Sequence, residues 1–128
     1  MAAALRTALV ADDEPLHREL LAVFLETMGF SSVAMASEAV QVVPLFLATE
    51  PRPSIVLLDH PFGRFSGLEV LRDLLSADPH VRVVLMSQDE DARTYCMRSG
   101  AFDFIVKPYA IPEVGRAVNR AMRPAVGS

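Results

Sequence analysis

The sequence contains very little cysteine and no long apolar run. Cys96 is the single cysteine, which excludes an internal disulfide and suits a reducing cytoplasm. No apolar stretch approaches the roughly 20 residues of a membrane-spanning helix, so no membrane contact is expected. The net charge of −4 disfavours direct binding to nucleic acid, because that needs clustered Lys and Arg on one face. These features together predict a cytoplasmic protein.

The sequence also lacks any sign of a domain boundary inside the chain. No internal repeat and no Gly/Ser-rich linker divides the 128 residues, so we expect one domain over 1–128. Within it, about 5–123 should form the folded core and 124–128 a C-terminal tail. A Gly-x-x-x-x-Gly-Lys phosphate loop is absent too, so a nucleotide is not the expected ligand. Lysine occurs only once, at Lys107, which marks that position as a candidate for a compact point charge.

What the sequence does contain is a regular alternation of short apolar runs with longer segments of helical periodicity. The short runs predict strands at 7–11, 32–36, 54–58, 81–86 and 102–106. The longer segments predict helices at about 15–28, 38–48, 66–75, 89–99 and 112–122. Pro44 falls inside the second helix and should kink or break it. Five strands alternating with five helices predict an α/β fold, a doubly wound parallel sheet with helices on both faces.

Polar side chains follow four of the five predicted strands. The first strand leads to Asp12 and Asp13, the third to Asp59, the fourth to Ser87 and the fifth to Lys107. The carboxyl ends of parallel strands lie at one edge of the sheet, where such folds bind ligands. A cluster of carboxylates there suits a hard cation such as Mg²⁺. With a hydroxyl and an ammonium nearby, a carboxylate can act as nucleophile and form an aspartyl phosphate.

Each of these residues also has an ordinary structural explanation. Asp12 and Asp13 would be favourable charges at a helix N-terminus, Asp59 would cap a loop, Ser87 would cap a helix, and Lys107 would simply leave a strand. Ser37, after the second strand, is expected to be such a cap. Four ordinary explanations would have to coincide at one sheet edge, so the functional interpretation is favoured.

With these motifs in place, the chain resembles the receiver domains of two-component response regulators, such as the chemotaxis regulators, over nearly its whole length. The matching stretches, in order along the chain, are "ADDEP", "IVLLD", "SGLEVL", "VVLMS" and "GAFDFIVKP". Each follows or contains its own predicted strand or opens the next helix. The resemblance implies a flavodoxin-like sheet of strand order 2-1-3-4-5. It also implies a phosphorylation-dependent signalling switch rather than an enzyme with a separate substrate.

The same resemblance assigns roles around the acidic cluster. Asp59 would accept the phosphoryl group. Asp12, Asp13 and Asp59 would hold Mg²⁺, and the main-chain carbonyl of Pro61 would add a further ligand, since proline keeps its C=O. The domain would then catalyse only its own phosphoryl transfer and dephosphorylation.

Further roles fall on the fourth and fifth strand ends. The resemblance makes Ser87 the switch hydroxyl and Lys107 the ammonium that binds the phosphoryl group, while Phe104 occupies the aromatic switch position. Gln88 stands where the family usually has a small residue, and it would either narrow access or hydrogen-bond to the phosphoryl oxygens. Asp89 lies where the family tunes the lifetime of the phosphoryl group, and an acid there would orient water.

The implied partners are a histidine kinase or a phosphotransfer protein as donor. The output partner is unknown, or an effector domain lies outside this sequence, and a homodimer through the fourth helix, fifth strand and fifth helix is an expectation from resemblance alone. The alternative function is a pseudo-receiver, an interaction module that works without phosphate. Gln88 supports that alternative, as do Phe62 and Gly63, which replace the Met-Pro usual in the family.

Overall fold

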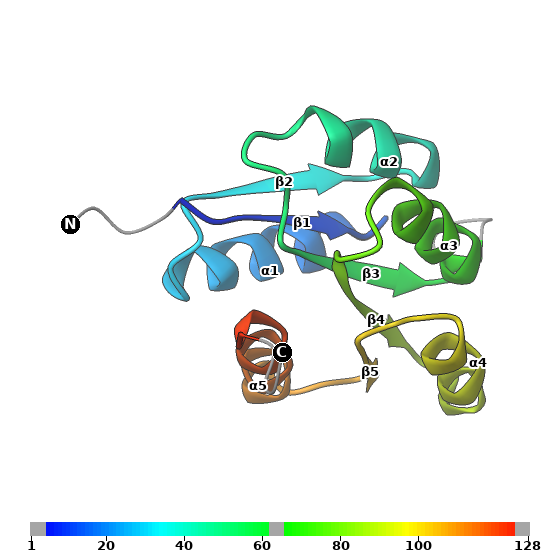
Figure 1. The fold of residues 1–128 in the computed structure, drawn as a ribbon. Helices are drawn as coiled ribbons and strands as arrows, with labels where there is room; N and C mark the ends of the chain where they lie inside the picture. Colours follow the sequence, from blue (N-terminus) through cyan, green and yellow to red (C-terminus); the bar gives the residue numbers. More distant parts are fainter. Residues whose placement is uncertain (1–4, 62–65, 125–128) are drawn as a thin grey trace.

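The computed structural model describes residues 5–61 and 66–124, and its centre is one five-stranded parallel sheet (Figure 1). The strands pair in the order β2-β1-β3-β4-β5, which confirms the predicted topology. They are β1 (Thr7–Ala11), β2 (Ser32–Ala36), β3 (Ile55–His60), β4 (Arg82–Ser87) and β5 (Asp103–Val106). β3 runs two residues beyond its predicted end, so Asp59 lies inside the strand and its direction is fixed by the sheet.

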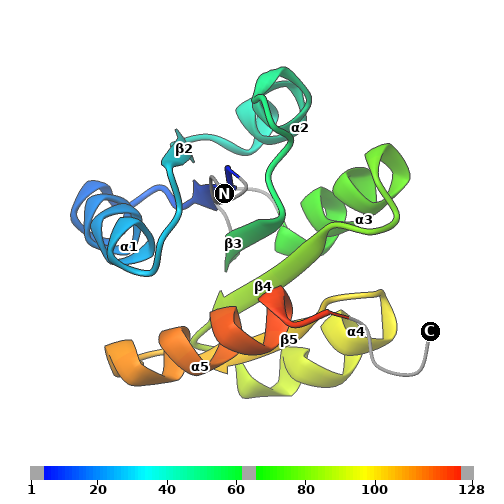
Figure 2. The same ribbon diagram turned by 60° about the vertical axis from the view of Figure 1, so that its left-hand side comes forward.

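Helices cover both faces of the sheet, as predicted. One face packs against α1 and α5, and the other against α2, α3 and α4, which Figure 2 shows as two layers on either side of the strands. The helices are α1 (Pro15–Thr27), α2 (Ala39–Ala48), α3 (Gly67–Ala77), α4 (Arg93–Arg98) and α5 (Ile111–Met122). Within the described ranges, no helix combines the length and apolarity needed to span a bilayer.

The alternation of side chains along β3 decides which way the site residues point. Ile55 and Leu57 are buried in the layer under α1 and α5, whereas Val56 and Leu58 are buried in the layer under α2, α3 and α4. Successive side chains of a strand point to opposite faces. Asp59 therefore points to the same face as Ile55 and Leu57, and His60 points to the opposite face, towards α3.

The second helix differs from the prediction in two ways, at its internal proline and at its N-terminal cap. A kink or a break was predicted at Pro44, and the break is wrong because α2 is one helix that continues through this residue. Pro44 is exposed, while Val42 and Phe46 on either side are wholly buried and hold the helix on the sheet. Its N-cap is Glu38, not Ser37, and the Gln41 side chain accepts hydrogen bonds from both of their main-chain N–H groups.

Helix ends elsewhere follow the sequence more closely. Gly29 ends α1 with a φ of +102°, a backbone conformation that favours glycine. The Ser66 hydroxyl caps α3 by accepting a hydrogen bond from the Leu68 N–H at 3.1 Å. The predicted helix over 89–99 is divided: a 3₁₀ turn, η1 (Glu90–Ala92), precedes the short α4.

Candidate functional site

Three carboxylates meet at the carboxyl edge of the sheet. Asp12 and Asp13 follow β1, and Asp59 lies near the end of the neighbouring strand β3. One oxygen from each lies within 4.8 Å of the others. Asp12 and Asp59 are buried, with exposed fractions of 1% and 6%, whereas Asp13 is exposed. The structure thus brings together the acidic residues that the sequence singled out.

Asp12 shows that this cluster fits a cation. Its Oδ1 accepts a hydrogen bond from the Glu14 N–H at 2.8 Å, but its Oδ2 is buried and has no hydrogen-bond partner among the described residues. Burial raises the pKa of the Asp12 carboxyl above its usual range, and the hydrogen bond and Lys107 only partly oppose that shift. A buried carboxylate oxygen without a donor, beside two other carboxylates, suits a hard cation that prefers oxygen ligands.

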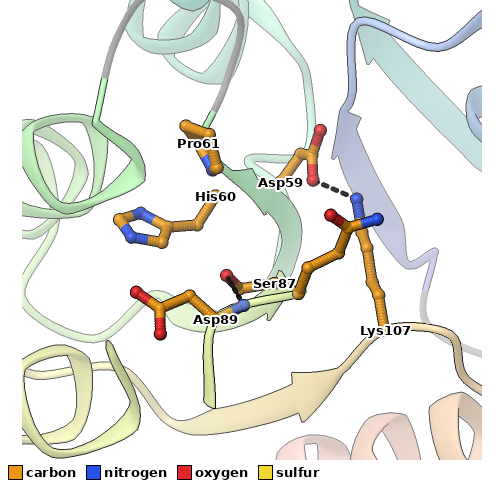
Figure 3. Close-up of a pocket in the computed structure, with 7 residues that line it drawn as sticks. Asp59, His60, Pro61, Ser87, Asp89 and Lys107 are labelled. Atoms are coloured by element: carbon orange, nitrogen blue, oxygen red, sulfur yellow. Dashed lines mark hydrogen bonds and ion pairs between the residues drawn. The ribbon is translucent and has the colours of Figure 1, made fainter. Parts of the chain in front are cut away.

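Asp59 is paired with the only lysine of the chain. Lys107 Nζ donates to Asp59 Oδ1 from the segment that follows β5, as Figure 3 shows. Burial raises the pKa of the Asp59 carboxyl; the hydrogen bond from Lys107 opposes this shift, and the neighbouring Asp12 adds to it. A carboxylate must be ionised to attack an electrophile, so the ammonium favours the reactive form of Asp59.

The hydroxyl of Ser87 is held at the end of β4. Ser87 is fully buried, and its Oγ accepts a hydrogen bond from the Asp89 N–H at 3.0 Å. The Lys107 N–H donates to the Ser87 carbonyl oxygen at 2.7 Å, which fixes the two strand ends side by side. Since the hydroxyl accepts the bond from Asp89, its own hydrogen can still donate to a bound oxygen.

Of these groups, Asp59, Ser87 and Lys107 line a cavity of about 350 Å³ (Figure 3). That volume is roughly ten times the share of one water molecule in the liquid, so a phosphoryl group fits with water to spare. The residues that line the cavity are Asp59, His60, Pro61, Ser87, Gln88, Asp89 and Lys107. The cavity therefore includes Pro61, Gln88 and Asp89, for which the sequence predicted supporting roles.

Two other sequence expectations lie elsewhere. Phe104 does not line the cavity; it is buried in the core layer beneath α4, with an exposed fraction of 3%. Phe62 and Gly63, which depart from the family pattern, lie outside the described residues. Pro124 is the one residue of the predicted 124–128 tail that the structure describes.

His60 is a site residue that the sequence interpretation missed. Because neighbours along a strand point to opposite faces, the sequence favours a surface position for His60, which adjoins Asp59. The face that it points to is, however, covered by the start of α3. The His60 side chain is half-buried and lines the cavity, and its Nδ1 has no hydrogen-bond partner among the described residues. Burial lowers the pKa of this imidazole below its usual range. Strand alternation gave the correct face but not what covers it.

The fold and the site together define a class of protein. It is a doubly wound α/β protein with carboxylates, a buried hydroxyl and an ammonium around one cavity at the carboxyl edge of its sheet. The family model described as "Response regulator receiver domain" matches residues 8–119. The chain belongs to this family, whose members are regulatory domains of two-component signalling.

Relatives and solved structures agree with this assignment. The chain is 32% identical over 116 residues to CcdB of Bacillus subtilis, which covers 89% of this chain and 95% of CcdB. It is 28% identical over 122 residues to AtoC of Escherichia coli; this covers 94% of the chain but 26% of AtoC, so the chain spans about a quarter of that regulator. A chain of the CheX–CheY–BeF3–Mg²⁺ complex from Borrelia burgdorferi superposes with a TM-score of 0.84 and 25% identity, covering 93% of this chain and 90% of that one.

The family assignment also explains the chemistry of the acidic edge. Receiver domains bind Mg²⁺ at an acidic pocket, and in this chain the structure shows an acidic cluster of Asp12, Asp13 and Asp59 at the carboxyl edge of the sheet. The Asp12 oxygen that has no hydrogen-bond partner among the described residues gives an independent structural reason why a cation would fit there.

Proposed function

We propose that this domain is a cytoplasmic phosphorylation switch that accepts a phosphoryl group on Asp59 in the presence of Mg²⁺. The donor is a histidine kinase or a histidine phosphotransfer protein. The observation that carries the proposal is the buried Asp59 carboxylate, paired with Lys107 and clustered with Asp12 and Asp13 beside a cavity of about 350 Å³.

The chemistry is a displacement at phosphorus. A carboxylate oxygen of Asp59 forms a bond to phosphorus while the bond from phosphorus to the donor's histidine nitrogen breaks, and the electron pair stays on that nitrogen. Lys107 and the Ser87 hydroxyl then donate to phosphoryl oxygens. Asp12, Asp13 and the Pro61 carbonyl would hold the metal with Asp59. When bound, Mg²⁺ neutralises negative charge on the transferring group.

The switch starts from the charge that phosphorylation adds, about −1.5 to −2 at pH 7. The Ser87 hydroxyl turns to the phosphoryl oxygens and gives up the geometry in which it accepts from the Asp89 N–H. Phe104 is the aromatic residue whose position responds. The response is a shift between two existing conformations of α4, β5 and α5, not a change of fold.

Two exposed residues at the cavity set the rates of this cycle. Gln88 lines the cavity and also an outer depression beside Lys107, so it stands in the entrance. Asp89 lines the same cavity and can orient the water that attacks the aspartyl phosphate. The domain would thereby catalyse its own dephosphorylation.

The donor protein docks on the outer depression next to the entrance. Leu20 of α1 lines this depression with Gln88 and Lys107, and it is 52% exposed. Leu16, one turn before it on α1, is 73% exposed. Apolar side chains exposed at or near a depression that shares Gln88 and Lys107 with the cavity suit a protein donor, whose histidine must approach the carboxylate closely.

The test of phosphorylation is intact mass after incubation with acetyl phosphate, with and without Mg²⁺. Wild-type protein should gain one phosphoryl group only with Mg²⁺, and Asp59→Ala should gain none. Asp73→Ala removes an exposed carboxylate of α3 and should label like the wild type. Absence of labelling in the wild type, under conditions that label another receiver domain, would reject the proposal.

That negative result would favour the second candidate, a pseudo-receiver that binds its partner without phosphate. Gln88 at the entrance is the observation on its side.

The output surface that we propose is the α4–β5–α5 face, through which two copies would associate. Met97 of α4, with an exposed fraction of 42%, lies one helical turn after Arg93, which contacts Phe104 of β5, and it therefore exposes apolar surface on this side of α4. Sedimentation velocity with and without beryllofluoride and Mg²⁺ tests this association. Equal sedimentation of the two forms over a range of concentrations would exclude a phosphorylation-dependent dimer.

A further inference from the structure

The ring of Phe104 is buried in the core of the domain. Phe104 lies in β5 and belongs to the core layer that includes Leu85 of β4 and Cys96 of α4. Its exposed fraction is 3%. Contacts with other residues of this chain therefore hold the ring in this buried position.

Arg93 provides such a contact. It is the first residue of α4, and its guanidinium carbon lies 5.1 Å from the centroid of the Phe104 ring. Its Nη1 also donates a hydrogen bond to the Phe104 carbonyl oxygen at 3.1 Å. One side chain from the helix thus contacts both the ring and the main chain of the same β5 residue. Arginine suits this double contact because its guanidinium is planar, stacks on aromatic faces and has several donors.

A short hydrogen-bonded segment connects Arg93 to the phosphorylation cavity. The Ser87 Oγ accepts from the Asp89 N–H at 3.0 Å, and the Ala92 N–H donates to the Asp89 carbonyl at 3.1 Å. Arg93 follows directly. If the Ser87 hydroxyl turns towards a phosphoryl group, residues 88–92 lose this hydrogen bond to the end of β4 while they stay joined to it through the main chain. The next residue along the chain is Arg93, which contacts Phe104.

We propose that Arg93 is a positioning residue that holds Phe104 in its buried position and couples the ring to the 88–92 segment. The contact itself stands on the geometry of α4 and β5, whereas its use in signalling rests on the proposed phosphorylation of Asp59. Arg93 touches no reacting atom. Its effect is on the equilibrium between a buried and an outward ring.

The experiment places 4-fluorophenylalanine at position 104 and compares its fluorine resonance in H₂O and D₂O. The wild-type background should give one resonance with a small solvent isotope shift, because the ring is buried. Arg93→Met keeps the alkyl stem but removes the stacking charge and the donor, and it should give a second resonance or a clearly larger isotope shift.

Two variants provide the controls. Arg82→Met removes another arginine that stacks on a phenylalanine, since Arg82 lies 5.1 Å from the Phe102 ring, and it should leave the position-104 resonance unchanged. Arg93→Lys keeps the charge but not the planar group, so it should fall between the wild type and Arg93→Met. Identical resonances and isotope shifts in the wild type and Arg93→Met would overturn the proposal, because packing alone would then hold the ring.

Beryllofluoride with Mg²⁺ separates this result from the proposed function. If Arg93→Met exposes the ring and beryllofluoride returns the buried resonance, both the contact and its link to Asp59 hold. An exposed ring in Arg93→Met that ignores beryllofluoride supports the contact and counts against signalling through it. A loss of the phosphorylation of Asp59 appears independently in the intact-mass test.

Discussion

At the scale of single residues, Gly67 shows how closely the site and its supporting helix approach one another. Gly67 is the first residue of α3 and is buried. A Cβ added there would lie 2.9 Å from both the Cβ and the Nδ1 of His60, and 3.0 Å from the main-chain oxygen of Asp59. The start of α3 therefore fits against the end of β3 only because this position has no side chain.

Gly67→Ala should destabilise the protein by about 1–3 kcal/mol, the usual cost of overpacking. Urea unfolding monitored by circular dichroism measures the change, with the slope expected to stay constant. Gly115→Ala is the control: its Cβ would lie 3.3 Å from the end of the Phe24 ring, which can move, and alanine favours the helix. If both variants have the same stability as the wild type, the close approach at Gly67 has no energetic weight.

A substitution of Gln88 can show whether its side chain restricts the entry of a phosphodonor to the cavity or binds the phosphoryl group. Because it lines both the cavity and the outer depression, Gln88→Ala should open the entrance and increase the rate of labelling by acetyl phosphate several-fold. Asn119→Ala, which removes an exposed amide from α5, should label at the wild-type rate. Slower labelling of Gln88→Ala would mean that the amide binds the phosphoryl group instead of restricting its entry.

The sequence predicted some of these residues and not others for a physical reason. Asp12, Asp59 and Lys107 were predictable because each follows or ends a strand, and parallel strands bring their ends together. Gly67 and Arg93 matter through contacts with residues of other elements, and no local pattern encodes which side chain a helix end will meet. Such contacts become visible only when the helices are placed.

At the scale of the elements, α2 shows a local preference overruled by packing. Pro44 cannot donate a main-chain hydrogen bond and disfavours the helix, yet α2 continues past it because Val42 and Phe46 bury fully against the sheet. The prediction of a break used propensity alone. Strand positions were predicted well because burial determines the short apolar runs, whereas the order of the strands came from the family resemblance and not from these runs. The 3₁₀ turn before α4 has no distinct sequence pattern.

Pro44→Ala should stabilise the protein by about 2–3 kcal/mol, since it removes the cost of proline inside a helix at an exposed position. Thermal unfolding followed by far-ultraviolet circular dichroism, which reports the helix content, gives the shift in Tm. Pro15→Ala is the matched control: Pro15 is the first residue of α1, where proline is compatible with the helix, so its loss should be neutral or slightly destabilising. A drop in Tm for Pro44→Ala would show that the ring itself stabilises α2.

At the scale of the whole molecule, the buried carboxylates at the carboxyl edge of the sheet lower the stability of the folded protein when no cation is bound. Asp12 and Asp59 are buried together with Asp13 nearby, and Lys107 supplies one positive charge among the described residues at the cavity. Burial raises the pKa of both buried carboxyls above the usual 3.8, so their ionised forms are disfavoured in the folded protein. The cluster is therefore costly without a cation and favourable with one, which couples overall stability to both pH and Mg²⁺.

The sign of the pH effect follows from this shift. Between pH 3.8 and the raised pKa, the folded protein holds the Asp12 proton more tightly than the unfolded chain, so stability falls as pH rises through that window and stays lower above it. Asp12→Asn removes the charge with little change of shape. In metal-free buffer the variant should equal the wild type below pH 3.8, gain on it through the window, and be more stable at pH 7.

Saturating Mg²⁺ should reverse the order at pH 7, because a ligand that binds only the folded state stabilises it by about 2.7 kcal/mol at 100 times Kd. The wild type would gain that stability, while Asp12→Asn, lacking the buried carboxylate oxygen that has no hydrogen-bond partner among the described residues, would gain much less. Denaturant unfolding at pH 3 and pH 7, with EDTA or with MgCl₂, measures all four cases. A wild type that is more stable than Asp12→Asn in EDTA at pH 7 would mean that the ionised Asp12 stabilises the fold by itself, and the metal would then not be the reason for its burial.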